Sequence, residues 1–243
     1  MKFSHVFASL IVVSITLLPF KGLQAKTLSE EGFKQYVVEL KKEALDQGFE
    51  QNLIETSFAK VKFHKRAVTA DRKQPEKVET LDSYLPKRVP SWKVKKARTL
   101  YKEHQKLLSN IGNDYGVQPR FIVALWGLET NFGKIMGNYN VISALSTLAF
   151  EGRREAFFKK QLWAALTILK EGHIKIDEMK GSWAGAMGQN QFMPTSFVSY
   201  AVDGDGDGKK DIWTNQADVF ASMANYLRKE GWNADLTWGR QIS

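Results

Sequence analysis

The sequence predicts a mainly α-helical fold. Apolar residues recur at the three- and four-residue spacing of helices in most segments between residues 29 and 170. Glycine and proline stand where those segments begin or end, and stretches with the alternating pattern of a strand are sparse. We therefore expect helices stacked around one apolar helix at residues 119–133.

The chain begins with the pattern of a secretory signal. Lys2 precedes an apolar run at about residues 6–20, and Ala25 supplies a small residue before a cleavage point. We expect residues 1–25 to be removed, which leaves residues 26–243. The run is too short to favour a membrane span, no later stretch is apolar enough for one, and an uncleaved anchor is the alternative.

Composition limits the possible classes of protein. The 243 residues suffice for one large domain or two small ones. The absence of cysteine excludes a disulfide framework, a thiolate metal site, a cysteine nucleophile and a lipid-modified N-terminal cysteine. The formal charge of +9 becomes +7 without the two lysines of residues 1–25, and it favours anionic partners. No basic and aromatic recognition motif points to nucleic acid.

The N-terminal part is predicted to hold two helices and a connection. Ser29 can cap a helix that ends at Gly48, and a second short helix follows at about residues 53–58. Residues 62–92 are polar, basic and interrupted by prolines, so we predict a long connection across the surface. Tyr84 lies in this connection and is a candidate for a sugar contact, or else it pins a loop.

The remaining helices are predicted from the same signals. Residues 94–111 form an amphipathic pattern and residues 112–116 a turn, after which Pro119 opens the apolar helix and Gly133 closes it. Further helices are predicted at residues 141–150, 153–170 and 194–200, and from about residue 215.

Glu129 is the main candidate for catalysis. It is the only charged residue between Arg120 and Lys134. Apolar residues cover two neighbouring faces of its helix, so we expect the helix to be largely buried and the carboxyl to be buried with it. A carboxyl desolvated beside Trp126 keeps its proton at higher pH, as a general acid requires. The alternative is an ordinary helix glutamate bonded to a backbone amide.

An acidic loop predicts a metal site. Asp203, Asp205 and Asp207 stand at positions 1, 3 and 5 of Asp-Gly-Asp-Gly-Asp-Gly, a spacing that directs carboxylates at one cation and suits Ca²⁺. Lys209 would add its carbonyl at position 7. Thr214 replaces the usual glutamate at position 12, so the loop needs another acid to close it.

Several motifs in order resemble lytic murein transglycosylase B and its relatives (SLT domain 2, glycoside hydrolase family 103), which cleave the glycan strands of bacterial peptidoglycan. The resemblance covers roughly residue 84 to the end. It rests on Glu129-Thr-Asn-Phe-Gly133, Ser146-Thr-Leu-Ala-Phe150, Arg153-Arg154, the charge-free stretch Gly181–Ser196, Asp203–Gly208, Ala224-Asn-Tyr226 and Gly231-Trp232.

The resemblance implies a lysozyme-like helical catalytic domain with an EF-hand-like metal loop. It implies a core at residues 93–243 preceded by a helical extension and connection at residues 26–92. Family members usually continue well beyond the Gly-Trp motif, so we expect a C-terminally truncated form. The signal pattern and the absence of cysteine predict a soluble exported protein, most simply periplasmic and not a lipoprotein, although several family members carry a lipid-modified cysteine; we also expect a monomer.

The resemblance also assigns roles to individual residues. Ser182 and Gln191 are implied to contact sugar around the carboxyl of Glu129, although Gln191 could instead satisfy loop backbone groups. Tyr226 belongs to the same set, and Asp218 is implied to close the Ca²⁺ site. Arginine forks bind carboxylates, so Arg153 and Arg154 are candidates for the muramyl lactyl group or stem peptide, or are plain surface residues.

The implied reaction needs one glutamate. Ordinary glycosidases use two carboxylates, and the motif stretches around Glu129 offer no second one outside the acidic loop. In the family, the glutamate protonates the bridging oxygen and then takes a proton from the C6 hydroxyl, which closes onto C1 as a 1,6-anhydromuramyl end. The alternatives are a calcium-stabilised murein-binding scaffold without turnover and a hydrolytic muramidase.

Overall fold

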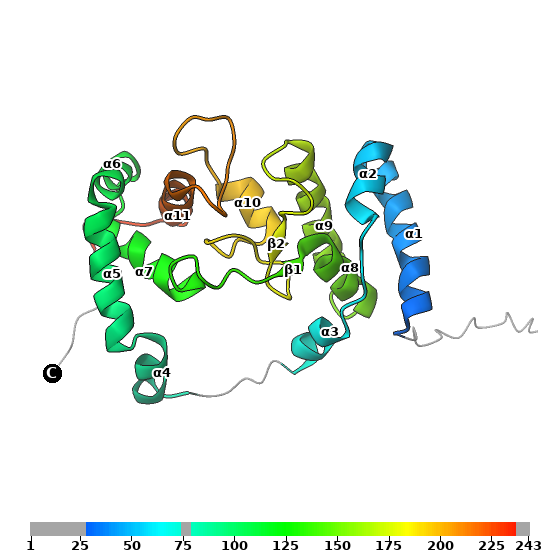
Figure 1. The fold of residues 1–243 in the computed structure, drawn as a ribbon, viewed down its shortest axis with the longest axis horizontal. Helices are drawn as coiled ribbons and strands as arrows, with labels where there is room; N and C mark the ends of the chain where they lie inside the picture. The colour runs from blue at the N-terminus through cyan, green and yellow to red at the C-terminus, as the bar shows by residue number, and fades with distance from the viewer. Residues whose placement is uncertain (1–27, 74–78, 237–243) are drawn as a thin grey trace, which may run out of the picture.

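The computed structural model describes residues 28–73 and 79–236 (Figure 1). The predicted signal segment, residues 1–25, lies outside the described residues. The described elements, in order, are α1 Glu30–Asp46, α2 Gln51–Phe58, α3 Lys65–Arg72, α4 Leu81–Arg88, α5 Ser91–Glu103, α6 Gln105–Tyr115, α7 Pro119–Thr130, β1 Tyr139–Asn140, α8 Val141–Glu151, α9 Glu155–Lys170, β2 Lys180–Gly181, α10 Pro194–Tyr200 and α11 Gln216–Lys229.

Two hydrophobic cores organise these helices. In the first core, α1, α2 and α3 pack against α8 and α9, and α10 packs on α9. Helix α8 lies at its centre, because every residue from Val141 to Phe150 is buried. A helix that is buried all round is expected only inside a core.

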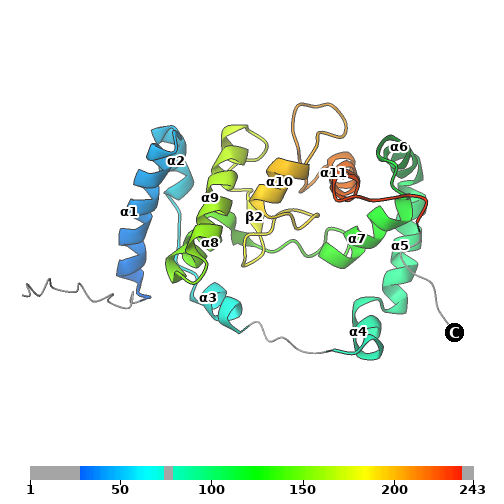
Figure 2. The same ribbon diagram turned by 180° about the vertical axis from the view of Figure 1, so that it is seen from behind.

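The second core lies at the other side of the molecule, as Figure 2 shows from behind. There α5, α6, α7 and α11 pack together, and the buried residues include Ile122 and Trp126 of α7 and Phe220 of α11. The aromatic rings of Trp126 and Phe220 meet edge to face with centroids 5.1 Å apart, a favoured geometry for ring pairs.

The first helix shows how local sequence signals position an element. The Ser29 hydroxyl accepts a hydrogen bond from the Gly32 amide at 3.0 Å, which satisfies one of the unpaired amides of the first turn. Buried residues at helical spacing then face α8, and the Tyr36 hydroxyl donates to Glu155 of α9 at 2.7 Å. The predicted cap at Ser29 is confirmed.

The prediction of a long connection at residues 62–92 is wrong in part, because this segment contains α3 and α4. Helix α3 forms because Ala67 and Val68 are buried against α8, a contact that the basic composition hid. Helix α4 begins at Thr80, whose hydroxyl accepts a hydrogen bond from the Ser83 amide. Pro86 lies inside α4 and Pro90 is the N-cap residue of α5, so these prolines accompany helices.

The single helix predicted at residues 94–111 is also wrong, since the chain bends at His104 and continues as α6. The imidazole of His104 packs against the rings of Trp126 and Phe220, with centroids 5.9 and 5.4 Å away. This tertiary contact outweighs the continuous helical pattern, and it lets α6 turn onto α11.

A short antiparallel strand pair connects the segment that follows α7 to the segment that follows α9. Tyr139 of β1 pairs with Gly181 of β2, and Asn140 pairs with Lys180. Asn140 then caps α8 by accepting a hydrogen bond from the Ser143 amide at 2.8 Å. None of the helices in the described ranges combines the length and apolar content that crossing a membrane requires.

Candidate functional site

Helix α7 is buried on one face only, so the prediction that it is largely buried is wrong. Ile122, Val123, Trp126 and Thr130 face the second core, but Leu128 is 50% exposed and Glu129 is exposed beside it. The apolar surface on the other side of the helix is left open to solvent because α5, α6 and α11 cover only one side.

Glu129 is nevertheless in an unusual environment for a surface carboxyl. Burial of part of the group raises its pKa above the ordinary value of 4.5, and desolvation is the cause. Among the described residues, no hydrogen bond or ion pair reaches the carboxylate. The alternative of a glutamate bonded to a backbone amide is therefore not what the described part of the chain shows.

The chain reverses immediately after Glu129 through three consecutive left-handed residues. Asn131, Phe132 and Gly133 have φ angles of 53°, 61° and 79°. The Phe132 ring folds back onto α7 so closely that a Cβ atom on Gly127 would lie 2.7 Å from it. Such backbone conformations are costly for residues other than glycine, so the surrounding packing must hold this turn in place.

Gln189 bonds to the C-terminal part of α7. Its Oε1 accepts a hydrogen bond from the Trp126 indole at 2.6 Å, and its backbone carbonyl accepts one from the Thr130 hydroxyl at 3.0 Å. No role for Gln189 is predicted from the sequence. A polar residue in a charge-free, glycine-rich stretch was a weak signal, because it does not reveal which groups the side chain meets.

Ser182 lies in the loop that follows β2 and organises that loop. Its hydroxyl accepts hydrogen bonds from the amides of Ala184 at 3.3 Å and Ala186 at 3.1 Å. Ser182 is half-buried as a residue, and its predicted sugar contact stays a prediction.

Gln191 connects the same loop to the chain leaving α7. Its side-chain amide donates to the carbonyls of Met136 at 3.1 Å and Gly188 at 3.0 Å. Loop backbone groups are thus satisfied, as the alternative reading of Gln191 proposed. The loop is packed tightly here, because a Cβ atom on Gly137 would overlap the backbone of Gly181. Ser182 and Gln191 therefore lie alongside the segment that follows Glu129.

Arg153 and Arg154 precede α9, and α9 begins at Glu155 rather than at the predicted residue 153. Both guanidinium groups pair with the buried carboxylate of Asp71 on α3. The structure thus gives the two arginines an intramolecular acid. Each side chain is still about half exposed, and their contact with a substrate stays a prediction.

The two predicted aromatic contacts lie on different helices. Tyr84 on α4 is 42% exposed, with the Arg88 guanidinium 5.4 Å from its ring centre. Tyr226 on α11 is partly exposed and packs against the rings of Phe192 and Tyr200. Both rings are accessible, and their predicted contacts with sugar stay predictions.

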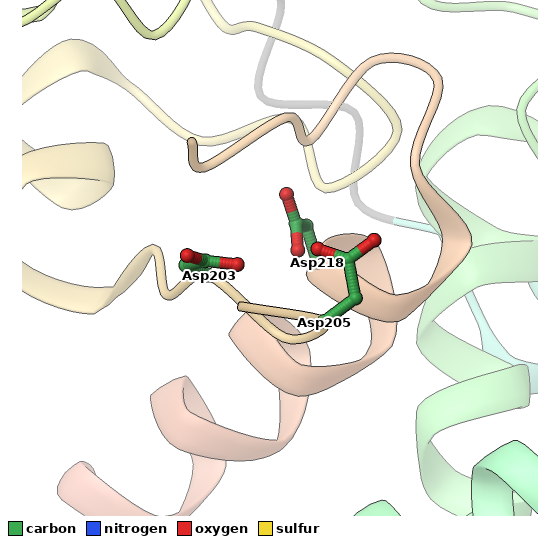
Figure 3. Close-up of side chains that lie close together, drawn as sticks. All are labelled: Asp203, Asp205 and Asp218. Carbon is green, nitrogen blue, oxygen red and sulfur yellow. The ribbon is translucent and has the colours of Figure 1, made fainter. Parts of the chain in front are cut away.

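The acidic loop does bring carboxylates together, and Figure 3 shows three of them facing one another. Asp203, Asp205 and Asp218 each offer an oxygen, and these oxygens lie within 4.8 Å of one another. Asp218 comes from α11, as the resemblance implied, while the other two come from the loop after α10.

The chemistry of this group fits a hard divalent cation. Asp218 is fully buried and accepts hydrogen bonds from the amides of Gly204 at 2.6 Å and Asp211 at 2.5 Å. Burial and the neighbouring aspartates raise its pKa to about 6. Three converging carboxylates, one of them buried, are stabilised when a cation neutralises their repulsion.

Asp207 and Lys209 do not join this group in the structure. The Asp207 carboxylate accepts a hydrogen bond from the Lys209 amide at 2.8 Å and is exposed. Asp207 is thus not among the three converging carboxylates, and its predicted role as a metal ligand stays a prediction. The side-chain oxygen instead closes a tight local turn, as aspartates in loops often do. The carbonyl of Lys209 stays a predicted ligand.

Comparisons with known proteins agree with this arrangement. A family model described as transglycosylase SLT domain matches residues 32–243. The chain is 36% identical over 150 residues to membrane-bound lytic murein transglycosylase B of Escherichia coli (strain K12), which covers 61% of this chain and 41% of that protein.

Solved structures are similar as well. SltB3 from Pseudomonas aeruginosa in complex with NAG-NAM-pentapeptide superposes with a TM-score of 0.82 and 43% identity, covering 85% of this chain and 55% of that one. The soluble lytic transglycosylase SltB1 from the same organism gives a TM-score of 0.76 and 33% identity, covering 84% and 68%. Escherichia coli SLT35 in complex with calcium gives 0.71 and 29%, covering 83% and 64%. The chain thus spans about half of the length of lytic murein transglycosylase B and of SltB3.

Proposed function

Because the chain belongs to the transglycosylase SLT domain family, we propose that it is a peptidoglycan lytic transglycosylase. It would cleave the β-1,4 bond between MurNAc and GlcNAc without water and leave 1,6-anhydromuramyl ends. The observation that supports this most directly is Glu129, a carboxyl with a raised pKa and no partner among the described residues, at the end of α7.

In this proposal Glu129 acts twice. Burial raises its pKa, so the carboxyl keeps its proton to higher pH than a solvated glutamate, and that proton passes to the oxygen of the breaking glycosidic bond. The carboxylate then takes the proton of the C6 hydroxyl while that oxygen bonds to C1. Proton and charge balance without water, and the substrate's N-acetyl group stabilises the positive centre between the two steps.

The arrangement of the other acids supports a single-carboxylate reaction. Hydrolytic glycosidases pair two carboxylates across the bond. Here the acids of the loop after α10 either converge with Asp218 or hold local backbone amides, as Asp211 does for Trp213. They are thus engaged away from the reacting bond, so we favour the lyase over the hydrolytic muramidase.

We further propose that Asp203, Asp205 and Asp218 bind Ca²⁺. The ion would neutralise the buried carboxylate and fix the loop to α11, so its role would be structural. The calcium complex of a similar protein supports this choice of metal.

Substrate contacts and location complete the proposal. Ser182, Gln191, Tyr84 and Tyr226 are proposed to contact the glycan, and Arg153 or Arg154 its acidic groups. The substrate places the protein in the periplasm. The complex of SltB3 with a NAG-NAM-pentapeptide supports a substrate of this class.

Digestion of purified murein tests the proposal. Soluble products would be separated, and the masses of the disaccharides measured by mass spectrometry to identify their ends. Anhydro ends, one water lighter than reducing ends, are expected. Reducing ends would replace the lyase by a hydrolase. Binding to murein without digestion would leave a calcium-stabilised scaffold.

A further inference from the structure

Gln189 lies between the two hydrophobic cores and bonds to both. It is 5% exposed and uncharged. Trp126 belongs to the second core, whereas Ile212 and Trp213 belong to the first. A buried amide that bonds to groups from two cores fixes their relative position more tightly than apolar packing does, because each hydrogen bond has a direction.

On one side, Gln189 holds the end of α7. The Trp126 indole donates to its Oε1 at 2.6 Å, and the Thr130 hydroxyl donates to its backbone carbonyl at 3.0 Å. These two residues flank Glu129, three positions before it and one position after it. Gly133 leaves space for the amide, since a Cβ atom there would lie 2.5 Å from Oε1.

On the other side, Gln189 is anchored to the segment that follows the acidic loop. Its amide nitrogen donates to the Trp213 carbonyl at 2.9 Å, and its backbone amide donates to the Ile212 carbonyl at 2.8 Å. Gln216 donates weakly to the same Oε1 at 3.3 Å. Within the described residues, every hydrogen-bonding group of Gln189 is therefore engaged.

We propose that Gln189 is a positioning residue for Glu129. It fixes the C-terminal end of α7 against the first core, from within the loop that also carries Ser182 and Gln191. This inference rests on the proposed function. Gln189 touches neither the substrate nor the carboxyl, and it acts through Trp126 and Thr130. A glutamate that both gives and takes a proton must stay aligned with two oxygens, and a misplacement of about 1 Å can cost roughly 100-fold in rate.

The test is Gln189→Met, which keeps the volume and removes the side-chain hydrogen bonds. We expect kcat for murein fragments to fall about 10- to 100-fold, with KM within about twofold of wild type. In two-dimensional NMR, the indole N–H signal of Trp126, assigned with Trp126→Phe, should shift as its acceptor is lost. A merely structural role predicts lower stability with kcat unchanged, and that result would overturn the proposal.

Gln161→Met is the matched control. Gln161 is equally buried at 3% exposed, and its amide bonds to Thr195 within the first core at 2.9 and 3.0 Å. Its replacement should lower the melting temperature by a similar amount and leave kcat at the wild-type value. If the control lowers kcat as strongly, the effect is one of general stability and Gln189 has no special role.

Thr130→Val gives an independent answer if Gln189→Met does not fold. It removes one donor to the Gln189 carbonyl and should lower kcat with little change in KM; an unchanged kcat would again count against the proposal. The wild-type protein distinguishes a failure of the proposed function from a failure of the proposed role of Gln189. If wild type makes no anhydro product, the proposed function fails, whereas an active wild type with a fully active Gln189→Met overturns only the role of Gln189.

Discussion

The environment of Glu129 combines access with desolvation. The side chain is exposed enough to reach a ligand, yet surrounding protein atoms raise its pKa. No other charged group is needed to explain the shift, since desolvation is its cause. A proton held in this way can be given up without first breaking an ion pair.

Glu129→Gln should abolish turnover and leave the fold intact. The amide has the same size but cannot give and then recover a proton, so the loss should exceed the 10²–10⁴-fold that general acid catalysis typically contributes. Release of anhydro-muropeptides would be measured beside circular dichroism spectra of both proteins. Digestion near the wild-type rate would refute the assignment of Glu129.

The pH dependence follows from the raised pKa. Activity should fall as pH rises through the folded-state pKa, because the first step needs the proton. The folded state also binds this proton more tightly than the unfolded state, whose pKa is near 4.5. Stability is therefore lost as pH rises from the unfolded to the folded pKa, and the cost persists at neutral pH.

Melting curves across pH would check whether stability falls as pH rises. Glu129→Gln does not titrate, so it should be at least as stable as wild type at pH 7, and the difference should vanish below about pH 4. A mutant clearly less stable at pH 7 would mean that the ionised carboxylate stabilises the fold.

The turn after Glu129 gives a third prediction. Gly116 and Gly133 both have left-handed backbones, with φ of 66° and 79°. Gly116→Ala should cost roughly 1–2 kcal/mol for that backbone alone, as nothing lies near its Cβ position. Gly133→Ala should cost more, because the new methyl group meets Gln189. Urea unfolding of both variants measures the difference; equal losses would mean that Gln189 yields easily.

At this scale the sequence singled out the candidate for catalysis but not the residue that holds its helix. Glu129 became the candidate because it is the only charged residue between Arg120 and Lys134. Gln189 could not be assigned, since its partners Trp126 and Trp213 are 63 and 24 positions away. Sequence spacing reveals neighbours on one helix and says little about a hydrogen bond across two cores.

At the scale of elements, the acidic loop gives the clearest prediction. Ca²⁺ should raise the melting temperature, because a ligand that binds only the folded state stabilises it, by about 2.7 kcal/mol at 100 times Kd. Asp205→Ala should remove this gain. Differential scanning calorimetry with Ca²⁺ or a chelator measures it.

Asp177→Ala is the control for that experiment. Asp177 is exposed and pairs with Lys60 outside the acidic loop, so its loss should leave the Ca²⁺ response intact. A melting temperature indifferent to both Ca²⁺ and chelator would discredit the metal site.

The link between α3 and the start of α9 is a further element-scale prediction. Asp71 is buried, and both its partners are arginines. Replacing Arg153 and Arg154 by alanine together should lower the free energy of unfolding clearly, since a buried carboxylate is left without a counter-charge. Lys34→Ala breaks a fully exposed pair with Glu31 and should cost less than about 1 kcal/mol. Denaturant unfolding compares them, and similar small losses would show that water reaches Asp71.

The elements themselves were predicted unevenly. Mainly helical, lysozyme-like architecture is confirmed, and helices with strong apolar patterns such as α8 lie close to their predicted ranges. The break at His104 and the short helices α3 and α4 were missed. The break at His104 and helix α3 depend on tertiary contacts, which local patterns do not contain. Helix α4 buries no residue, and its signal is the local cap at Thr80.

At the scale of the whole molecule, the two cores are interleaved along the chain. The first core takes α1–α3 and then α8–α10, whereas the second takes α5–α7 and then α11. The division predicted at residues 92 and 93 stays a prediction. A cut there would nevertheless separate Phe33 and Tyr36 from Phe150, whose ring lies 5.6 and 5.5 Å from theirs.

This interleaving has a consequence for synthesis on the ribosome. The first core cannot close until α10 has left the exit tunnel, and the second must wait for α11. Early helices therefore remain with exposed apolar faces while about two thirds of the chain is being made, a state prone to aggregation. Since each core needs segments distant in sequence, folding should be slow for a helical protein. An export route that keeps the chain unfolded until it is complete would suit this topology.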